Sequence, residues 1–81
     1  MPNIRACCFV QIEDNAFKNF ISCCRLKSGI HECFRLTGQY DAMLEINVPN
    51  VASLYEIVQY IMQLPGMQSI NTHLIAQEWT L

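Results

Sequence analysis

The fold is decided by residues 30–48, which read IHECFRLTGQYDAMLEINV. Residues 30–36, which include the β-branched Ile30 and the aromatic Phe34, are expected to form a strand. Residues 37–40 form a connection of hairpin length, and Gly38 within it can adopt positive φ without steric cost. Residues 42–48 alternate, which puts four apolar side chains on one face of a second strand: Ala42, Leu44, Ile46 and Val48. The stretch therefore predicts an antiparallel hairpin.

Helical periodicity flanks this hairpin on both sides. Residues 16–27 repeat apolar side chains at helical spacing, with Phe17, Phe20, Ile21 and Cys24 on one face. Residues 13–15 offer N-cap side chains, while Lys27 and Gly29 suit the end of this helix. Residues 51–64 show the same pattern with Leu54, Ile57, Val58 and Ile61. Asn50 is a favoured N-cap, and the Leu-Pro-Gly sequence at 64–66 stops the second helix.

Two further strands are expected at residues 4–12 and 67–76, because both segments are short, largely apolar and bounded by turn residues. The element order is then βαββαβ. This order predicts a ferredoxin-like α+β fold, with a four-stranded antiparallel sheet and two helices on one face. Residues 1–81 are expected to form a single domain, because the chain is short and nothing in it reads as a linker.

The composition predicts an oligomer. Apolar residues make up 52% of the chain and charged residues only 15%, against about 25% charged in an average domain. No run of about 18 uncharged apolar residues exists that could cross a membrane. The face opposite the helices is also expected to be apolar, with Cys7, Phe9, Cys33, Met43 and Ile75. This face is expected to pack on a second copy in a dimer.

Several other sites and partners are not expected. The five basic residues are dispersed, without the basic stripe of a nucleic-acid binder: Arg5, Lys18, Arg25, Lys27 and Arg35. The five cysteines lack the spacing of a zinc site, and their odd number without a signal peptide indicates structural thiols in a reducing cytoplasm. His31 and His73 have no acid or cysteine at motif spacing and are assigned no role. Trp79 is expected to anchor the C-terminal segment.

The hairpin and the second half of the chain resemble the effector-binding domain of the Lrp/AsnC family of prokaryotic regulators, also called the RAM domain. The resemblance is carried by residues 31–41 (HECFRLTGQYD), residues 44–46 (LEI), the LPGM turn at 64–67 and Thr72 ahead of Leu74. Its most specific parts are the Gly-x-aromatic-Asp sequence at 38–41 and the Leu-Pro-Gly turn. The resemblance covers essentially the whole chain.

The resemblance implies a cytoplasmic domain that binds a small effector, an amino acid above all, and whose dimers assemble into a ring. It also implies an effect on transcription, either through a full-length Lrp/AsnC relative or as part of a longer regulator. Two departures stand out. The chain has no helix-turn-helix, so it is either a stand-alone effector domain or a piece of a longer protein. Ile70 stands where family members often carry the first of two threonines.

The expected effector site comprises Gly38, Gln39, Tyr40, Asp41, Ala42 and Thr72. Asp41 supplies a carboxylate for a ligand ammonium, and backbone N–H groups of the glycine turn suit a ligand carboxylate. From the residues alone, turn chemistry explains both Gly38 and Asp41 and is favoured over ligand binding. Tyr40 either lines the pocket or lies in a subunit contact, and Thr72 either binds ligand or is an ordinary strand residue. The resemblance favours effector binding.

Three alternatives remain open. An enzyme is not expected, because the sequence shows no Ser/Cys–His–acid arrangement, metal motif or phosphate loop, and no cofactor is implied. An ACT-like amino-acid-binding module has the same element order, but its usual Asp-x-Pro-Gly turn is replaced by Glu-Asp-Asn-Ala at 13–16. A pure assembly module without a ligand is the third alternative. Ligand screening separates binding from assembly.

Overall fold

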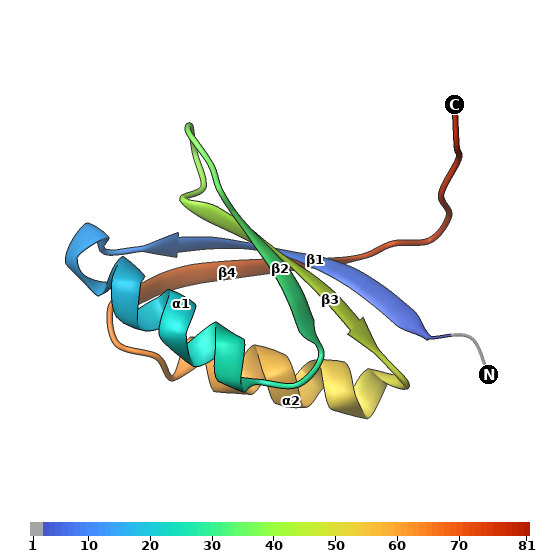
Figure 1. The fold of residues 1–81 in the computed structure, drawn as a ribbon, viewed down its shortest axis with the longest axis horizontal. Helices are drawn as coiled ribbons and strands as arrows, with labels where there is room; N and C mark the ends of the chain where they lie inside the picture. The colour runs from blue at the N-terminus through green and yellow to red at the C-terminus, as the bar shows by residue number, and fades with distance from the viewer. Residues whose placement is uncertain (1–2) are drawn as a thin grey trace.

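A computed structural model describes residues 3–81 and confirms the expected order of elements (Figure 1). The strands are β1 (Ile4–Ile12), β2 (Ile30–Arg35), β3 (Ala42–Val48) and β4 (Met67–Leu74). The helices are α1 (Phe17–Leu26) and α2 (Val51–Met62), with a short 3-10 turn η1 (Asp14–Ala16) ahead of α1. Residues 1 and 2 of the expected domain lie outside the described residues.

The four strands form one sheet in the order β2-β3-β1-β4, and every neighbouring pair is antiparallel. Both helices lie on one side of this sheet (Figure 1). The ferredoxin-like α+β fold is thereby confirmed. We call the opposite side of the sheet the open face. Its side chains are Arg5, Cys7, Phe9 and Gln11 of β1, Glu32 and Phe34 of β2, Met43, Glu45 and Asn47 of β3, and Ser69, Asn71 and His73 of β4.

The core lies between the sheet and the helices. The two central strands alternate between buried and half-buried positions, β3 over its whole length and β1 from Arg5 to Ile12, as expected for strands with one face on a core. The buried set is Ala6, Cys8, Val10 and Ile12 of β1, Ala42, Leu44, Ile46 and Val48 of β3, Phe17, Phe20 and Cys24 of α1, and Leu54, Ile57 and Ile61 of α2. The predicted inward faces of β3 and of both helices are therefore confirmed.

The two helices begin differently. Asn50 caps α2 as predicted, because its side-chain oxygen accepts a hydrogen bond from the Ser53 backbone N–H at 2.8 Å. The predicted cap at residues 13–15 is wrong, since no side chain there caps α1. The chain instead enters α1 through η1, which is closed by a backbone bond from Ala16 N–H to Glu13 O at 3.0 Å. Asp14 is thereby free to pair with Arg35 at 2.7 Å.

Three other expectations fail for identifiable reasons. Cys33 does not lie on the open face: a register shift between Ile30 and Glu32 turns it toward the core, where it pairs with Leu44. The strands expected to end at residues 36 and 76 end at Arg35 and Leu74, and the helices are also shorter than predicted. Trp79 does not anchor its segment within the subunit, because 70% of it is exposed.

Candidate functional site

The β2–β3 loop, residues 36–41, is fastened to the end of β1. A backbone bond from Leu36 N–H to Asp41 O at 2.9 Å closes the loop, and Asp41 N–H donates to Val10 O at 2.9 Å. The side-chain amide of Gln11 donates to Gln39 O at 2.9 Å. Gly38 at the tip has a φ of +110°, which confirms its predicted conformation. The loop is therefore held in place by β1 as well as by its own two strands.

Asp41 is half-buried and already serves the fold. Its carboxylate oxygen Oδ2 accepts a hydrogen bond from Ile12 N–H at 2.8 Å. The β1–β4 register shifts between Gln11 and Ile12, which interrupts the ladder at this point. The other oxygen, Oδ1, accepts no hydrogen bond from any residue in the range 3–81. One half of the carboxylate is thus fixed by the backbone, and the other half is available to a ligand.

Tyr40 lies over the open face, not over the core. Its ring lies 5.5 Å from that of Phe9, and its hydroxyl accepts a hydrogen bond from the Asn71 side-chain amide at 3.1 Å. The Phe9 ring in turn meets His73 edge-on at 5.9 Å. Beside them, the Ser69 hydroxyl donates to the Gln11 side chain at 2.6 Å. The loop end of the open face is therefore a patch of aromatic and uncharged polar side chains.

The six predicted site residues divide into two groups. Gly38, Gln39, Tyr40 and Asp41 come together at the loop end of the open face. Ala42 follows them directly, but its side chain is fully buried in the core, so that only its backbone reaches the loop. Thr72 lies on the helix side of β4, where its hydroxyl shares a hydrogen bond with the Cys8 thiol at 3.3 Å. A single subunit therefore presents Thr72 and Tyr40 on opposite faces of the sheet.

Four neighbours of the loop are absent from the predicted site: Phe9, Gln11, Ser69 and Asn71. Each comes from β1 or β4, far from the loop in sequence. Their position depends on the register of β1 against β3 and β4, which alternation along a single strand does not fix. The sequence around these residues gives one indication of the arrangement. Asn71 and Thr72 are consecutive in a strand, so their side chains lie on opposite faces of the sheet.

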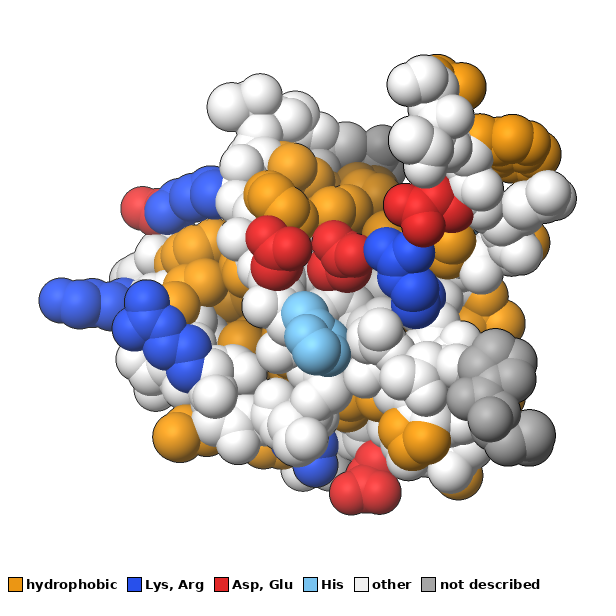
Figure 2. Space-filling view, turned by 45° about the vertical axis from the view of Figure 1, so that its right-hand side comes forward, with side chains coloured by type: hydrophobic (Ala, Val, Ile, Leu, Met, Phe, Trp, Pro, Cys, Tyr) orange, Lys and Arg blue, Asp and Glu red, His pale blue; other side chains and the backbone are white. Residues whose placement is uncertain are grey.

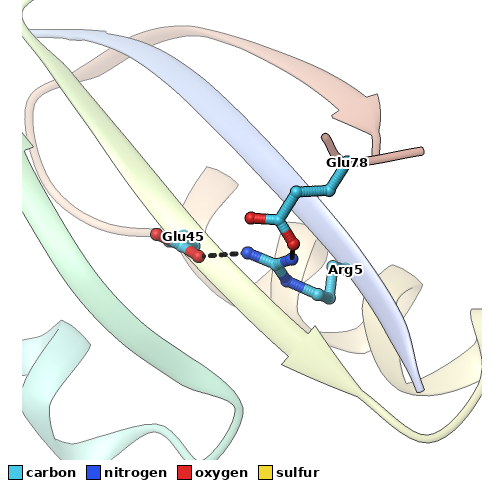
Figure 3. Close-up of polar contacts among 3 residues, drawn as sticks. All are labelled: Arg5, Glu45 and Glu78. Atoms are coloured by element: carbon cyan, nitrogen blue, oxygen red, sulfur yellow. Dashed lines mark hydrogen bonds and ion pairs between the residues drawn. The ribbon is translucent and has the colours of Figure 1, made fainter. Parts of the chain in front are cut away.

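The other end of the open face is charged. Arg5 donates from Nη2 to Glu45 Oε1 at 2.8 Å and from Nη1 to Glu78 Oε1 at 2.9 Å (Figure 3). The hydrogen bonds that Arg5 donates to Glu45 and to Glu78 raise the pKa of Arg5 above its usual value. Glu32 faces Glu45 across the β2–β3 pair. Figure 2 shows acidic side chains side by side near a basic one, with hydrophobic side chains exposed behind them.

One depression lies away from the β2–β3 loop, between α1 and β2. Its volume is about 520 Å³, and it is lined by Ile21, Cys24, Arg25, Ile30, His31, Glu32 and Cys33. Burial raises the pKa of Cys24 to about 12, with smaller contributions from Cys33 and Cys23, and burial also raises the pKa of Cys33. These thiols stay protonated at neutral pH, which favours a structural role. Within residues 3–81, no three His, Cys, Asp or Glu side chains are grouped to hold a metal ion.

No helix in the described part of the chain, residues 3–81, is long and apolar enough to cross a membrane.

Comparison with solved structures supports the fold. The transcriptional regulator NMB0573 of Neisseria meningitidis, in its L-Met complex, superposes with a TM-score of 0.87 at 21% identity over 96% of this chain and 53% of its own. Escherichia coli AsnC superposes with a TM-score of 0.85 at 12% identity, over 96% and 54% of the two chains. TTHA0845 from Thermus thermophilus superposes with a TM-score of 0.86 at 20% identity, over 96% of this chain and 99% of its own. The chain thus spans about half the length of the first two proteins and nearly all of the third.

No curated protein matches the chain in a sequence comparison. The family model of the Lrp/AsnC ligand binding domain matches residues 5–80. This match covers both specific motifs, the Gly-x-aromatic-Asp sequence at 38–41 and the Leu-Pro-Gly turn at 64–66, and it decides against the ACT-like alternative. The matched model describes the ligand binding domain of Lrp/AsnC transcriptional regulators. The chain belongs to the Lrp/AsnC ligand binding domain family.

Proposed function

We propose that this chain binds an amino acid at a site formed by Gly38, Gln39, Tyr40, Asp41 and Ala42 of one copy, with Thr72 of another. The observation that carries the proposal is that only one of the two carboxylate oxygens of Asp41 accepts a hydrogen bond within the described residues. Its oxygen Oδ2 is held by Ile12 N–H at 2.8 Å, so that Oδ1 has a fixed position for a ligand ammonium. The solved complex of NMB0573 with L-Met supports an amino acid as the ligand class.

The two groups of site residues support a site between copies. Tyr40 lies over the open face and Thr72 on the helix side of the edge strand β4. A small ligand does not span the sheet, so it contacts both residues only if they come from different copies. We therefore propose a ring in which the loop of one dimer meets the β4 edge of the next. Each dimer is formed through the open face, where Phe9, Phe34 and Met43 have no covering layer within residues 3–81.

The effect on transcription is proposed to be indirect. Three of the five basic side chains are paired with carboxylates: Arg5 with Glu45 and Glu78, Lys27 with Glu56, and Arg35 with Asp14. Paired and dispersed cations neutralise few phosphates, which argues against duplex binding by this domain alone. We propose that it acts in the cytoplasm by joining a DNA-binding relative or as part of a longer regulator.

Calorimetric titration with each of the twenty amino acids tests the proposal. Asp41→Asn is the informative variant, because an asparagine oxygen can still accept from Ile12 N–H while the charge is lost. We expect one or a few amino acids to bind wild type. Loss of a charged hydrogen bond should weaken binding by about ten- to a hundredfold in Asp41→Asn. Equal binding by both proteins contradicts the role of Asp41, and no binding to wild type leaves the assembly module as the function.

A further inference from the structure

Residues 75–81 leave the sheet toward the open face. Ile75 N–H donates to Arg5 O at 2.9 Å, which extends the pairing by one residue beyond β4. Glu78 then bonds to the Arg5 guanidinium at 2.9 Å, on the side of the sheet that carries Glu45 (Figure 3). Beyond this point Trp79 is 70% exposed and Leu81 is fully exposed. The segment is thus fastened at Glu78, and the side chains of Trp79 and Leu81 are exposed to solvent. Figure 1 shows the segment continuing beyond β4 to the C-terminus.

The two ends of the open face differ in charge. At the end where this segment leaves, Glu45 and Glu78 both bond to the guanidinium of Arg5, and Glu32 pairs with Glu45 across the β2–β3 ladder. At the loop end, the side chains are uncharged: Phe9, Phe34, Tyr40, Met43 and Asn71. Phe34 remains 42% exposed there. The open face is therefore acidic at one end and aromatic at the other.

This asymmetry selects one way of stacking two copies. A twofold dimer through the open face has its strands either parallel or antiparallel across the interface. The parallel arrangement puts acidic end on acidic end and buries like charges against one another, which is unfavourable. The antiparallel arrangement puts each acidic end on the partner's uncharged aromatic end. Trp79 of one copy then faces Phe9 and Tyr40 of the other.

The distances agree with this arrangement. Stacked sheets lie about 10 Å apart. The three residues after Glu78 reach about 10 Å when extended. Leu81, the third residue after Glu78, can therefore reach the partner through the backbone alone. Trp79, the first residue after Glu78, reaches toward the partner with its long side chain, and neither contact requires a change in the Glu78–Arg5 bond.

We propose that Trp79 anchors the dimer. The Trp79 side chain of each copy packs against Phe9, Tyr40 and Phe34 at the aromatic end of the other copy's open face. This proposal rests on the proposed dimer. It assigns to residues 75–81 a binding surface and a partner, which is another copy of this chain. The Arg5–Glu78 bond serves as the fixed point from which the anchor reaches across.

Trp79 is the only tryptophan in the chain, so its fluorescence reports on this contact directly. Emission wavelength and acrylamide quenching should be measured on the full chain over a dilution series, with sedimentation velocity at each concentration. We expect a blue-shifted, poorly quenched tryptophan in the dimer and a solvent-exposed one in the monomer. A solvent-exposed tryptophan in samples that sediment as dimers overturns the anchor but leaves the dimer. Shielding that does not change on dilution to monomer also overturns the anchor, and a chain that is monomeric throughout overturns the dimer itself.

A pair of matched variants makes the test independent of fluorescence. Trp79→Ala should weaken dimerisation by about tenfold or more, as expected for a large aromatic anchor in an interface. Leu26→Ala is the control, because Leu26 is 84% exposed at the end of α1, on the opposite side of the sheet. Leu26→Ala should leave the dissociation constant of the dimer unchanged. Equal dimer constants for Trp79→Ala and wild type contradict the anchor.

Discussion

The carboxylate of Asp41 accepts the backbone N–H of Ile12 at 2.8 Å, and this bond joins the β2–β3 loop to the point where the β1–β4 ladder is interrupted. The same side chain thus stabilises the fold and positions an oxygen for a ligand. The two roles can be separated because only one of them needs a negative charge.

Asp41→Ala should destabilise the domain, because it leaves the Ile12 N–H without its partner. The expected loss is about 1–3 kcal/mol in the free energy of unfolding. Asp41→Asn keeps an acceptor and should lose much less. Urea unfolding followed by circular dichroism measures both variants. Equal stability of Asp41→Ala and wild type would show that the 2.8 Å bond contributes nothing.

Two glycines with positive φ should respond differently to the same substitution. Gly38 has a φ of +110° and open space around the position of an added β-carbon, so Gly38→Ala should cost only the backbone penalty of about 1–2 kcal/mol. Gly66 has a φ of +80°, and a β-carbon there would clash with that of Ala16. Gly66→Ala should therefore be clearly more destabilising in thermal unfolding. The reverse order would contradict the close approach of the 64–66 turn to η1.

Asn50→Ala should destabilise the domain by about 1 kcal/mol through loss of the α2 cap at Ser53 N–H. Asn19→Ala, at an exposed position within α1, is the matched control and should have little effect or a slight stabilising one. Urea unfolding of the two variants compares them directly. If Asn19→Ala costs as much as Asn50→Ala, the cap is not the cause.

Stability should fall at alkaline pH because of the buried Cys24 thiol. Its pKa is raised from 9.0 to about 12 in the folded chain, mainly by burial. Below pH 9 the thiol is protonated in both the folded and the unfolded state, so its contribution to the free energy of unfolding is fully present. Between about pH 9 and 12 the unfolded thiol ionises first, so stability decreases. Cys24→Val should flatten the pH dependence in this interval, and an unchanged slope would exclude Cys24 as its source.

Much of the fold follows from local patterns in the sequence. The alternation from Ala42 to Val48 identifies β3 and its buried face correctly, and the hairpin-length connection around Gly38 correctly indicates a positive φ at that glycine. The predicted face of Cys33 is wrong because one extra residue at the β2 register shift reverses the alternation. The side of the sheet on which a residue lies thus depends on pairing as well as on period.

The candidate site is predictable from the sequence only in its loop. The motif at residues 38–41 marks the turn, but the contact of Asp41 with Ile12 joins residues far apart along the chain. Such a contact depends on which strands are neighbours and in which register. For the same reason, the sequence does not reveal that Tyr40 and Thr72 lie on opposite faces of the sheet.

The measurement that tests the shared site most directly is calorimetric titration of mixed variants. Asp41→Asn lacks the charge at the loop, and Thr72→Val lacks the hydroxyl on β4. Each variant alone should bind the effector amino acid weakly. If one copy supplies Asp41 and another supplies Thr72, mixing the two variants and allowing subunits to exchange should restore a fraction of wild-type sites with wild-type affinity. A mixture that binds no better than the separate variants would contradict a site shared between copies.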